Sequence, residues 1–385
     1  MSIKSEALDL HKKLQGKLTT EAKYHVKSRE DLALVYTPGV AAPCLEIKDD
    51  PKKAFNYTIK ANTIAVVSDG SAVLGLGNIG PEAAMPVMEG KCVLFKEFGG
   101  VNAFPIVLDT QDTEGIIQTV KNIAPAFGGI NLEDISAPRC FEIEERLKEM
   151  LDIPVFHDDQ HGTAIIVLAG LINALKVTGK DKEARVVVNG AGSAGIAISR
   201  LLLRYGMKNV TLVDREGIIS SESKNLNWMQ KKMLEVTNLS DQKGSLRDAL
   251  RGADVFIGVS APNIVDTDMV KSMNEKAIIF AMANPTPEIM PDLAKEAGAM
   301  VVGTGRSDFP NQVNNVLVFP GIFKGALSAH AKHITEEMKL DAAEAIAGLV
   351  GPDRLSADFI LPEAFDSAVT ECVAAAVLKC AGKQR

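Results

Sequence analysis

The sequence has no excess of basic residues. Its 42 Lys and Arg residues are outnumbered by 49 Asp and Glu residues, which gives a formal net charge of −7 over 385 residues. Proteins that bind the phosphate backbone of nucleic acids neutralise it with a clustered basic surface. We therefore expect no nucleic-acid partner.

Long apolar runs and paired cysteines are also lacking. The charged N-terminus carries no apolar signal-peptide core, and no run of eighteen apolar residues is free of a charge or a turn residue. The widely spaced cysteines form no CxxC motif; they are Cys44, Cys92, Cys140, Cys372 and Cys380. We expect a cytoplasmic protein without membrane contact, whose cysteines are reduced and mostly buried.

The composition is that of a globular protein. Hydrophobic residues make up 46% and charged residues 24%, and 31 Gly and 17 Pro are close to average usage. These values exclude disordered, collagen-like and repeat-rich proteins. A chain of 385 residues exceeds the size at which single cores stop growing, so we expect two domains.

The second half of the chain alternates strand-like and helix-like segments. Its Val-rich and Ile-rich runs are residues 185–189, 209–214, 253–260, 277–285 and 299–305. Such alternation is typical of a parallel sheet that is covered by helices on both faces. We predict a doubly wound, Rossmann-type α/β domain.

The first half predicts a smaller α/β domain. Strand-like runs cover residues 64–80, 90–100 and 103–109. We place the boundary near residues 155–164, which gives an N-terminal catalytic domain over residues 1–156 and a nucleotide-binding domain over residues 157–385. A buried connecting helix should follow and end at Gly179, and Thr335 should cap the first of two amphipathic helices in the tail.

A GxGxxG motif follows the 185–189 run and opens a helix. It consists of Gly190, Gly192, Ser193, Ala194 and Gly195. The first glycine permits a tight turn, the second lets the backbone approach a pyrophosphate, and the third allows close helix packing. We predict a dinucleotide site here.

Two neighbouring residues bear on the choice of dinucleotide. Asp214 ends the second strand of the unit, where an acidic residue binds a ribose 2′-hydroxyl and favours NAD. Arg215 beside it could instead hold the 2′-phosphate of NADP, or be an ordinary surface cation. The choice between NAD and NADP stays open.

Two pairs of adjacent acids lie in apolar surroundings. They are Glu133 with Asp134, and Asp158 with Asp159. A single such pair is usually solvated, but two apolar-flanked pairs favour a hard cation such as Mg²⁺ or Mn²⁺. The flanking His157 and His161 could be ligands, although a histidine beside a turn is more often structural.

Several uncharged and basic residues remain ambiguous. Asn284, Asn314 and Asn315 interrupt apolar runs, and amides at the ends of parallel strands can bind substrate or the nicotinamide side of a cofactor. Asn284 precedes a proline and could simply form a turn. Tyr36 precedes a Pro-Gly turn, and Lys91 opens an apolar run that reads as a strand; their residue types alone assign them no function.

Together these motifs resemble the malic enzymes of the short bacterial type. The resemblance runs through nearly the whole chain, in the order VYTPGVA, SDGSAVLGLGNIGPEAAMPVMEGK, INLEDISAP, FHDDQHGTA, GAGSAGIA, ANPTPE and NNVLVFPG. It implies oxidation of L-malate at C2 by NAD or NADP, decarboxylation of the bound oxaloacetate, and protonation of the enolate to give pyruvate.

The resemblance also implies roles for individual residues. Lys91 would be the general base and Tyr36 the acid that protonates C3, with Asp158 supporting the site or proton transfer. Glu133, Asp134 and Asp159 would bind the divalent metal. The amides complete the site: Asn284 and Asn315 would hold malate, and Asn314 would lie close to the cofactor.

One position departs from the longer eukaryotic branch, which has an arginine where this chain has Ala72. The resemblance further implies a homodimer in which Tyr36 could cross the interface.

Three alternative functions stay open. A malolactic enzyme and an amino-acid dehydrogenase would keep the fold but change the reaction, and an amino-acid dehydrogenase does not need the metal carboxylates. The third alternative is a nucleotide-binding regulatory protein without catalytic activity.

Overall fold

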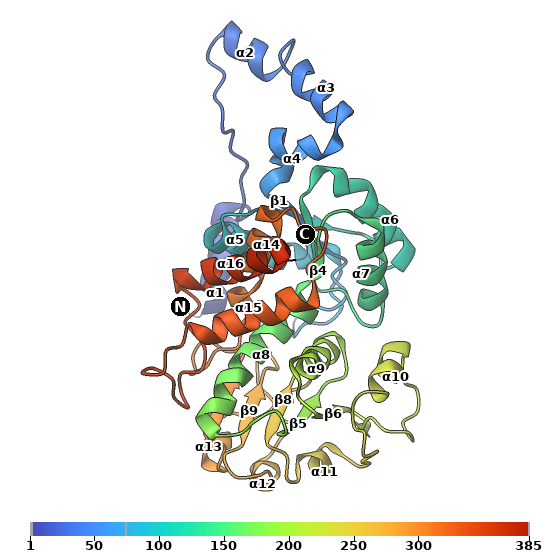
Figure 1. The fold of residues 1–385 in the computed structure, drawn as a ribbon, viewed down its shortest axis with the longest axis vertical. Helices are drawn as coiled ribbons and strands as arrows, with labels where there is room; N and C mark the ends of the chain where they lie inside the picture. Colours follow the sequence, from blue (N-terminus) through green and yellow to red (C-terminus); the bar gives the residue numbers. More distant parts are fainter. Residues whose placement is uncertain (1–2, 74, 384–385) are drawn as a thin grey trace.

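Two parallel β-sheets lie at the centre of the structure, a computed structural model that describes residues 3–73 and 75–383 (Figure 1). The predicted α/β fold with a doubly wound parallel sheet in the second half of the chain is confirmed. Helices cover both sheets, and the long helix α8 runs from one sheet to the other.

The first sheet has four parallel strands in the order β2-β1-β3-β4. The strands are β1 (Thr63–Ser68), β2 (Asn102–Val107), β3 (Gly129–Leu132) and β4 (Val155–His157). The connecting helices are α5 (Pro81–Gly99), α6 (Thr113–Ile123) and α7 (Arg139–Met150), with the short 3₁₀ helix η3 (Ala124–Ala126). Every residue of β1 is buried, as expected for the central strand of a sheet covered on both faces.

The second sheet has the order β10-β9-β8-β5-β6-β7, and only β7 is antiparallel to its neighbour. Its strands are β5 (Arg185–Asn189), β6 (Asn209–Asp214), β7 (Gly217–Ile218), β8 (Val255–Gly258), β9 (Ile278–Ala281) and β10 (Val301–Thr304). Its helices are α9 (Ser193–Tyr205), α10 (Trp228–Leu234), α11 (Leu246–Leu250), α12 (Thr267–Lys271) and α13 (Pro291–Glu296). The strand order reverses between β5 and β8, where ligands bind in such sheets.

Helix α8 (Asp158–Thr178) is the connecting helix expected from the sequence, and Gly179 ends it in a left-handed conformation. Among the described residues it is the one helix long and apolar enough to cross a membrane, but 83% of its apolar window is buried inside the protein. Its apolar surface is therefore used in the core. Asn173 in its middle donates hydrogen bonds to the carbonyl oxygens of Ala347 and Ile360 and so ties the tail to the helix.

The C-terminal helices return to the first sheet. They are α14 (Phe319–Ser328), α15 (Glu336–Gly348) and α16 (Ser367–Lys383), preceded by the 3₁₀ helix η4 (Asn315–Leu317). Phe319 packs against Phe95 of α5 with ring centroids 4.6 Å apart, and Phe323 contacts Phe156 of β4 at 5.9 Å. Helices from the end of the chain thus complete the core of its first half. The predicted boundary between residues 156 and 157, which falls inside β4, stays a prediction.

An N-terminal arm projects away from both sheets (Figure 1). The projecting part carries α2 (Arg29–Val35) and α3 (Ala41–Asp49), and the chain returns toward the first sheet through α4 (Ala54–Tyr57) and the 3₁₀ helices η1 (Pro51–Lys53) and η2 (Ile59–Asn62). Helix α1 (Ile3–Leu14) precedes the projection and lies in the body of the molecule, where the following Lys17 binds Glu89 of α5. None of the residues of these helices, all of which the structure describes, is buried. The arm nevertheless exposes apolar side chains, including Leu34 at 69% and Leu45 at 58%.

Two of the expected strands are corrected. Residues 90–100 belong to helix α5, whose buried positions include Met88, Cys92, Phe95 and Gly99, the three-to-four-residue spacing of a helix stripe. The expected strand over 64–80 ends at Ser68, because the following glycines take positive φ values and form a loop; residue 74 lies outside the described residues.

Candidate active site

The two pairs of acids lie side by side at one edge of the first sheet. Glu133 and Asp134 follow β3, and Asp158 and Asp159 follow β4, its neighbour in the sheet. The carboxyl ends of parallel strands form the crevice in which ligands bind. The topology therefore brings together residues that are 25 positions apart in the chain.

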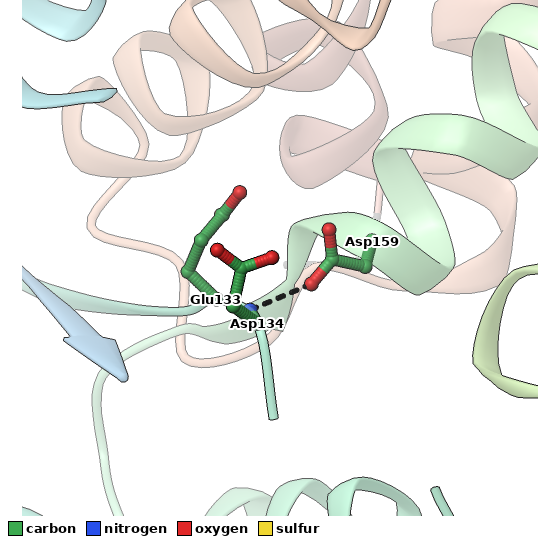
Figure 2. A group of neighbouring side chains, drawn as sticks. All are labelled: Glu133, Asp134 and Asp159. Atoms are coloured by element: carbon green, nitrogen blue, oxygen red, sulfur yellow. Dashed lines mark hydrogen bonds between the residues drawn. The ribbon is translucent and has the colours of Figure 1, made fainter. Parts of the chain in front are cut away.

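Three of these carboxylates converge on one space (Figure 2). Glu133, Asp134 and Asp159 each offer an oxygen, and the three oxygens lie within 4.8 Å of one another. The backbone N–H of Asp134 donates a hydrogen bond of 2.8 Å to Asp159 Oδ2. Asp134 adopts φ 54°, a conformation that costs energy for a residue other than glycine and that often marks functional sites.

Lys91 reaches the same cluster from helix α5. Its ammonium nitrogen lies 2.5 Å from Asp158 Oδ2 and 2.9 Å from Glu133 Oε1, and 4.1 Å from the centre of the Phe319 ring. Only 8% of Lys91 is exposed, and Asp158 is fully buried. A lysine that the sequence alone left unassigned is thus paired with two of the predicted acids.

Asn315 is also part of the cluster. Its side-chain amide donates to Asp158 Oδ2 at 2.5 Å. Asn314 instead accepts the N–H of Val316 and caps the 3₁₀ helix η4. Both residues therefore begin a helix, and the expectation that they end a strand is wrong.

Burial raises the pKa values of the acids, and the neighbouring carboxylates add to the rise. Burial, together with Asp159 and Glu133, raises the pKa of Asp134 to about 9. Burial raises the pKa of Asp158 and of Asp159 to about 6, although Lys91 opposes the rise. Burial alone would lower the pKa of Lys91, but Asp158 and Glu133 hold it above its usual range, so Lys91 is charged.

The donor set fits a divalent cation. Within the part of the chain that the structure describes, Asp134 Oδ2, Asp158 Oδ1 and Asn131 Oδ1 are buried without a hydrogen-bond partner. Buried acceptors normally have partners, so these oxygens indicate a missing positive ligand. Carboxylate oxygens from separate segments suit Mg²⁺ or Mn²⁺.

The two histidines beside the second pair differ. His161 binds Glu144 at 2.8 Å and Lys339 at 2.9 Å through its two ring nitrogens, which gives it a structural environment. His157 is fully buried, and its Nδ1 lies 3.7 Å from Asp159 Oδ2. Neither belongs to the carboxylate group that could hold the metal.

The sequence analysis did not identify a group of hydrogen bonds made by Arg139. Arg139 Nη2 lies 2.9 Å from each of Asp69 Oδ2, Ser71 Oγ and Ser136 Oγ. It joins the loop after β1 to the segment after Asp134. Its only sequence signal is the position of Asp69 directly after a strand.

Ala72 lies in the same loop after β1, which Arg139 binds through Asp69 and Ser71. Its backbone N–H donates to the carbonyl oxygen of Asp134 at 2.9 Å, and its methyl group is exposed. The position that carries an arginine in the longer branch therefore lies beside a predicted metal ligand. Farther along the same loop, a Cβ on Gly75 would lie 2.7 Å from the Asn284 carbonyl oxygen, so the loop touches the segment after β9.

The GxGxxG motif has the geometry that its glycines predict. A Cβ on Gly195 would lie 1.8 Å from the Gly190 carbonyl oxygen, so glycine is required for the helix to pack on the turn. Gly190 has φ 113°. A Cβ on Gly192 would have no atom within 4 Å, which leaves open space at the start of α9. Ser193 and Ala194 open that helix, whose N-terminus favours an anion.

The remaining predicted cofactor residues lie at the ends of neighbouring strands. Asp214 ends β6, and its Oδ1 accepts the N–H of Glu216 at 2.8 Å. Arg215 is exposed. Asn284 is exposed, follows β9 and precedes a cis proline. Their positions fit the crevice of the second sheet, and their roles stay predictions.

Tyr36 is not brought into the site. It ends helix α2 on the projecting arm and is 66% exposed (Figure 1). The arm is the part of the structure farthest from the two sheets. Within one chain, Tyr36 and Lys91 are therefore apart.

Substitution of Gly192 by alanine should weaken dinucleotide binding without unfolding the protein. The added methyl group has free space in the fold but would stand where a pyrophosphate approaches the backbone, so we expect at least a roughly tenfold loss of NAD(H) affinity. Fluorescence titration with NADH and thermal unfolding measure the two effects. Gly195→Ala is the matched control, because its methyl group clashes with Gly190 and should lower stability. Unchanged affinity in Gly192→Ala would contradict the predicted pyrophosphate position.

Asp134→Asn should stabilise the metal-free protein at alkaline pH. The pKa of Asp134 is about 9 in the fold and near 4 in an unfolded chain, so the unfolded chain releases its proton first and stability falls between these pH values. The asparagine variant escapes this loss, and its unfolding midpoint should rise by about 1 °C for each kcal/mol regained, because the unfolding entropy grows with chain length. Thermal unfolding with EDTA should show a larger gain at about pH 8 than at about pH 5. Equal gains at both pH values would show that the pKa of Asp134 is not raised in the folded protein.

Comparison with known proteins agrees with this geometry. Residues 15–148 match the family described as malic enzyme, N-terminal domain, and residues 160–382 match malic enzyme, NAD binding domain. The chain is 58% identical over 383 residues to the bifunctional malic/malolactic enzyme of Bacillus subtilis, covering 99% of this chain and 93% of that protein. It is 61% identical over 367 residues to the NAD-dependent malic enzyme of Geobacillus stearothermophilus, covering 95% and 77%.

Solved structures give the same result. The malic enzyme from Pyrococcus horikoshii superposes with a TM-score of 0.95 at 50% identity, covering 100% of this chain and 91% of that chain. The NAD-dependent malic enzyme from Thermotoga maritima gives 0.93 at 52% identity, covering 97% and 98%. The order of the motifs, the carboxylate cluster, the glycine turn and these matches agree, and the chain belongs to the malic enzyme family.

Proposed function

We propose that this chain oxidises L-malate at C2 with NAD or NADP as hydride acceptor and converts the resulting oxaloacetate to pyruvate and CO₂. The observation that carries this proposal is Lys91, buried between Asp158 and Glu133 at the carboxyl ends of β3 and β4. Relatives at 58% and 61% identity are named malic enzymes. Decarboxylation of added oxaloacetate is expected as a partial reaction.

Lys91 is the proposed general base for the C2 hydroxyl. Its two carboxylate neighbours keep it protonated in the metal-free protein, so it can accept a proton only after their charge has been offset. Asp158 bonds both Lys91 and Asn315 and can receive the proton of the ammonium group. The pair therefore forms a short path along which a proton moves away from malate.

Glu133, Asp134 and Asp159 are the proposed metal ligands. A bound Mg²⁺ or Mn²⁺ supplies Lewis acidity, which lowers the pKa of the malate hydroxyl and stabilises the negative charge that develops as CO₂ leaves. These three carboxyl groups and Asp158 lie close together, and Lys91 supplies only one positive charge among them.

Asn284 and Asn315 are proposed to hold malate, with Asn314 and Asn284 near the nicotinamide. Support for Asn315 comes from its bond to Asp158, which places its amide beside the reacting groups. Support for Asn284 comes from the contact of its backbone with the loop at Gly75. Malate would then lie between the two sheets, with the cofactor on the motif that begins at Gly190.

Tyr36 is the proposed acid that protonates C3, and it would come from a second copy of the chain. The arm that carries it exposes apolar side chains that a partner subunit could cover, and its position leaves the site in a single chain without this residue. A homodimer is therefore proposed. The cytoplasmic location stays a prediction.

One specific observation favours a second activity. The Bacillus subtilis relative is named a bifunctional malic/malolactic enzyme. If pyruvate stays bound next to the reduced cofactor, hydride return gives lactate with no net change in the nicotinamide. Malate conversion to lactate is therefore proposed as a secondary reaction.

The test is formation of reduced nicotinamide by the purified protein with L-malate and Mn²⁺, before and after chelation. We expect metal-dependent product with at least one cofactor, and loss of activity by more than about 100-fold in Asp159→Ala. Asp152→Ala, which removes an exposed carboxylate paired with Lys332, is the control and should retain activity. A preference for NAD would favour the Asp214 interpretation, and a preference for NADP the Arg215 interpretation.

Product analysis by chromatography separates the two activities. Lactate without reduced nicotinamide would make the malolactic reaction the main one. Turnover that survives chelation would contradict the metal site, and absence of both products would leave the non-catalytic interpretation.

Mixing of two inactive variants tests the shared site. Tyr36→Phe and Lys91→Ala chains should each be inactive. An equimolar mixture should regain up to about one quarter of the activity per site, because half of its dimers are mixed and one of the two sites in each mixed dimer receives both intact residues. Steady-state assays after co-refolding measure this gain. No recovery from a sample in which mass spectrometry detects mixed dimers would contradict a Tyr36 contributed by the partner.

A further inference from the structure

A buried chain of charged side chains connects the tail to the first turn of α8. Lys339 of α15 lies 2.9 Å from His161 Nδ1, and His161 Nε2 lies 2.8 Å from Glu144 Oε2. Glu144, on α7, also accepts the backbone N–H of His157 through Oε1 at 3.1 Å. Lys339 is 2% exposed and Glu144 4% exposed, so α7, α8 and α15 meet at a buried contact.

The direction of each hydrogen bond follows from the donors that each group carries. An ammonium group has only N–H donors, so in the contact between Lys339 and His161 the ring nitrogen Nδ1 is the acceptor. Burial lowers the pKa of Lys339 only to about 8, and the ammonium group therefore donates to Nδ1. The proton of the ring then lies on Nε2 and donates to Glu144. Glu144 receives both the ring N–H and the backbone N–H of His157.

The two side chains at the ends of this hydrogen-bonded series, Glu144 and Lys339, each have an additional partner. Lys148 lies 2.8 Å from Glu144 Oε1, and Glu336 lies 2.7 Å from Lys339. Burial would raise the pKa of Glu144, but His161 and Lys148 hold it well below its usual range. The carboxylate thus remains charged and keeps both acceptor oxygens in use.

The backbone held by Glu144 leads directly into the reacting residues. His157 is followed by Asp158, which binds Lys91, and by Asp159, a proposed metal ligand. The turn has little room, because a Cβ on Gly162 would lie 1.8 Å from Asp158 Oδ1. Hydrogen bonds behind the ligands of a metal fix their orientation, and their loss typically weakens metal affinity about 10–100-fold.

We propose that Glu144, His161 and Lys339 are positioning residues that hold the first turn of α8 in the geometry required for metal binding. This proposal rests on the proposed metal site at Glu133, Asp134 and Asp159. The three residues act through the backbone and do not touch the reacting groups. They make the metal affinity of the first sheet depend on a residue of the tail.

The test is Mn²⁺ affinity, measured by electron paramagnetic resonance without malate or dinucleotide. Glu144→Gln keeps the shape of the side chain, but its amide NH₂ faces a donor and cannot accept a hydrogen bond. We expect the dissociation constant for Mn²⁺ to rise about tenfold in Glu144→Gln and in Lys339→Met. NADH affinity, which depends on the second sheet, should be unchanged, whereas general unfolding would weaken both.

Lys332→Met is the matched control. Lys332 also lies in the tail and pairs with Asp152, but it is exposed, and its loss should leave Mn²⁺ affinity unchanged. If the chain of hydrogen bonds acts as a unit, Glu144→Gln combined with Lys339→Met should lose about tenfold, and not the hundredfold expected for independent residues.

Three results would overturn the proposal. Mn²⁺ affinity in both single variants within about twofold of the unchanged protein would exclude a positioning role. Multiplicative losses in the double variant would overturn the continuous connection from Lys339 through His161 to Glu144, because they would show that the residues act independently. If Glu144→Gln does not fold, Lys339→Met decides alone against the Lys332→Met control. Absence of Mn²⁺ binding by the unchanged chain would instead overturn the metal site, and with it this proposal.

Discussion

The contact of Lys91 with Asp158 and Glu133 is the interaction on which the site depends. Burying one ammonium group among several carboxylates is costly, because desolvation opposes every charge and the attraction repays it only at short range. Removal of Lys91 would leave the acids without a counter-charge. Burial raises the pKa values of Asp134 and Asp159, neighbouring carboxylates add to the rise, and Lys91 only partly opposes it. A divalent cation bound by these carboxylates would offset their mutual repulsion and the cost of burying them.

In both sheets, the candidate site residues follow the carboxyl ends of neighbouring parallel strands. In the first, the acids follow neighbouring parallel strands; in the second, the glycine turn and Asp214 follow β5 and β6. Helix α8 joins the two halves and carries Asp158 and Asp159 at its start. The tail closes the arrangement, because Phe319 packs on the α5 helix that presents Lys91, and Asn315 bonds Asp158. The residues proposed to bind metal and malate thus meet at the start of α8.

The sequence predicted some elements well because their signals are local. The glycine turn at 190–195 and the strands around it have fixed spacing, and the acid pairs stand out against apolar neighbours. The prediction was wrong at residues 90–100, where a compact apolar run hid the helical spacing of Met88, Cys92 and Phe95. The short strands β3 and β4 were not predicted, because four and three residues carry too little pattern.

The sequence by itself determined the family, the doubly wound sheet, the dinucleotide motif and the types of residue that bind metal. Only the tertiary structure decided which residues meet: Lys91 with Asp158, Arg139 with Asp69, and Lys339 with His161. It also separated Tyr36 from the rest of the site within one chain. The reason is physical. Local spacing fixes turns and periodic faces, but contacts between residues far apart in the sequence depend on how sheets and helices pack.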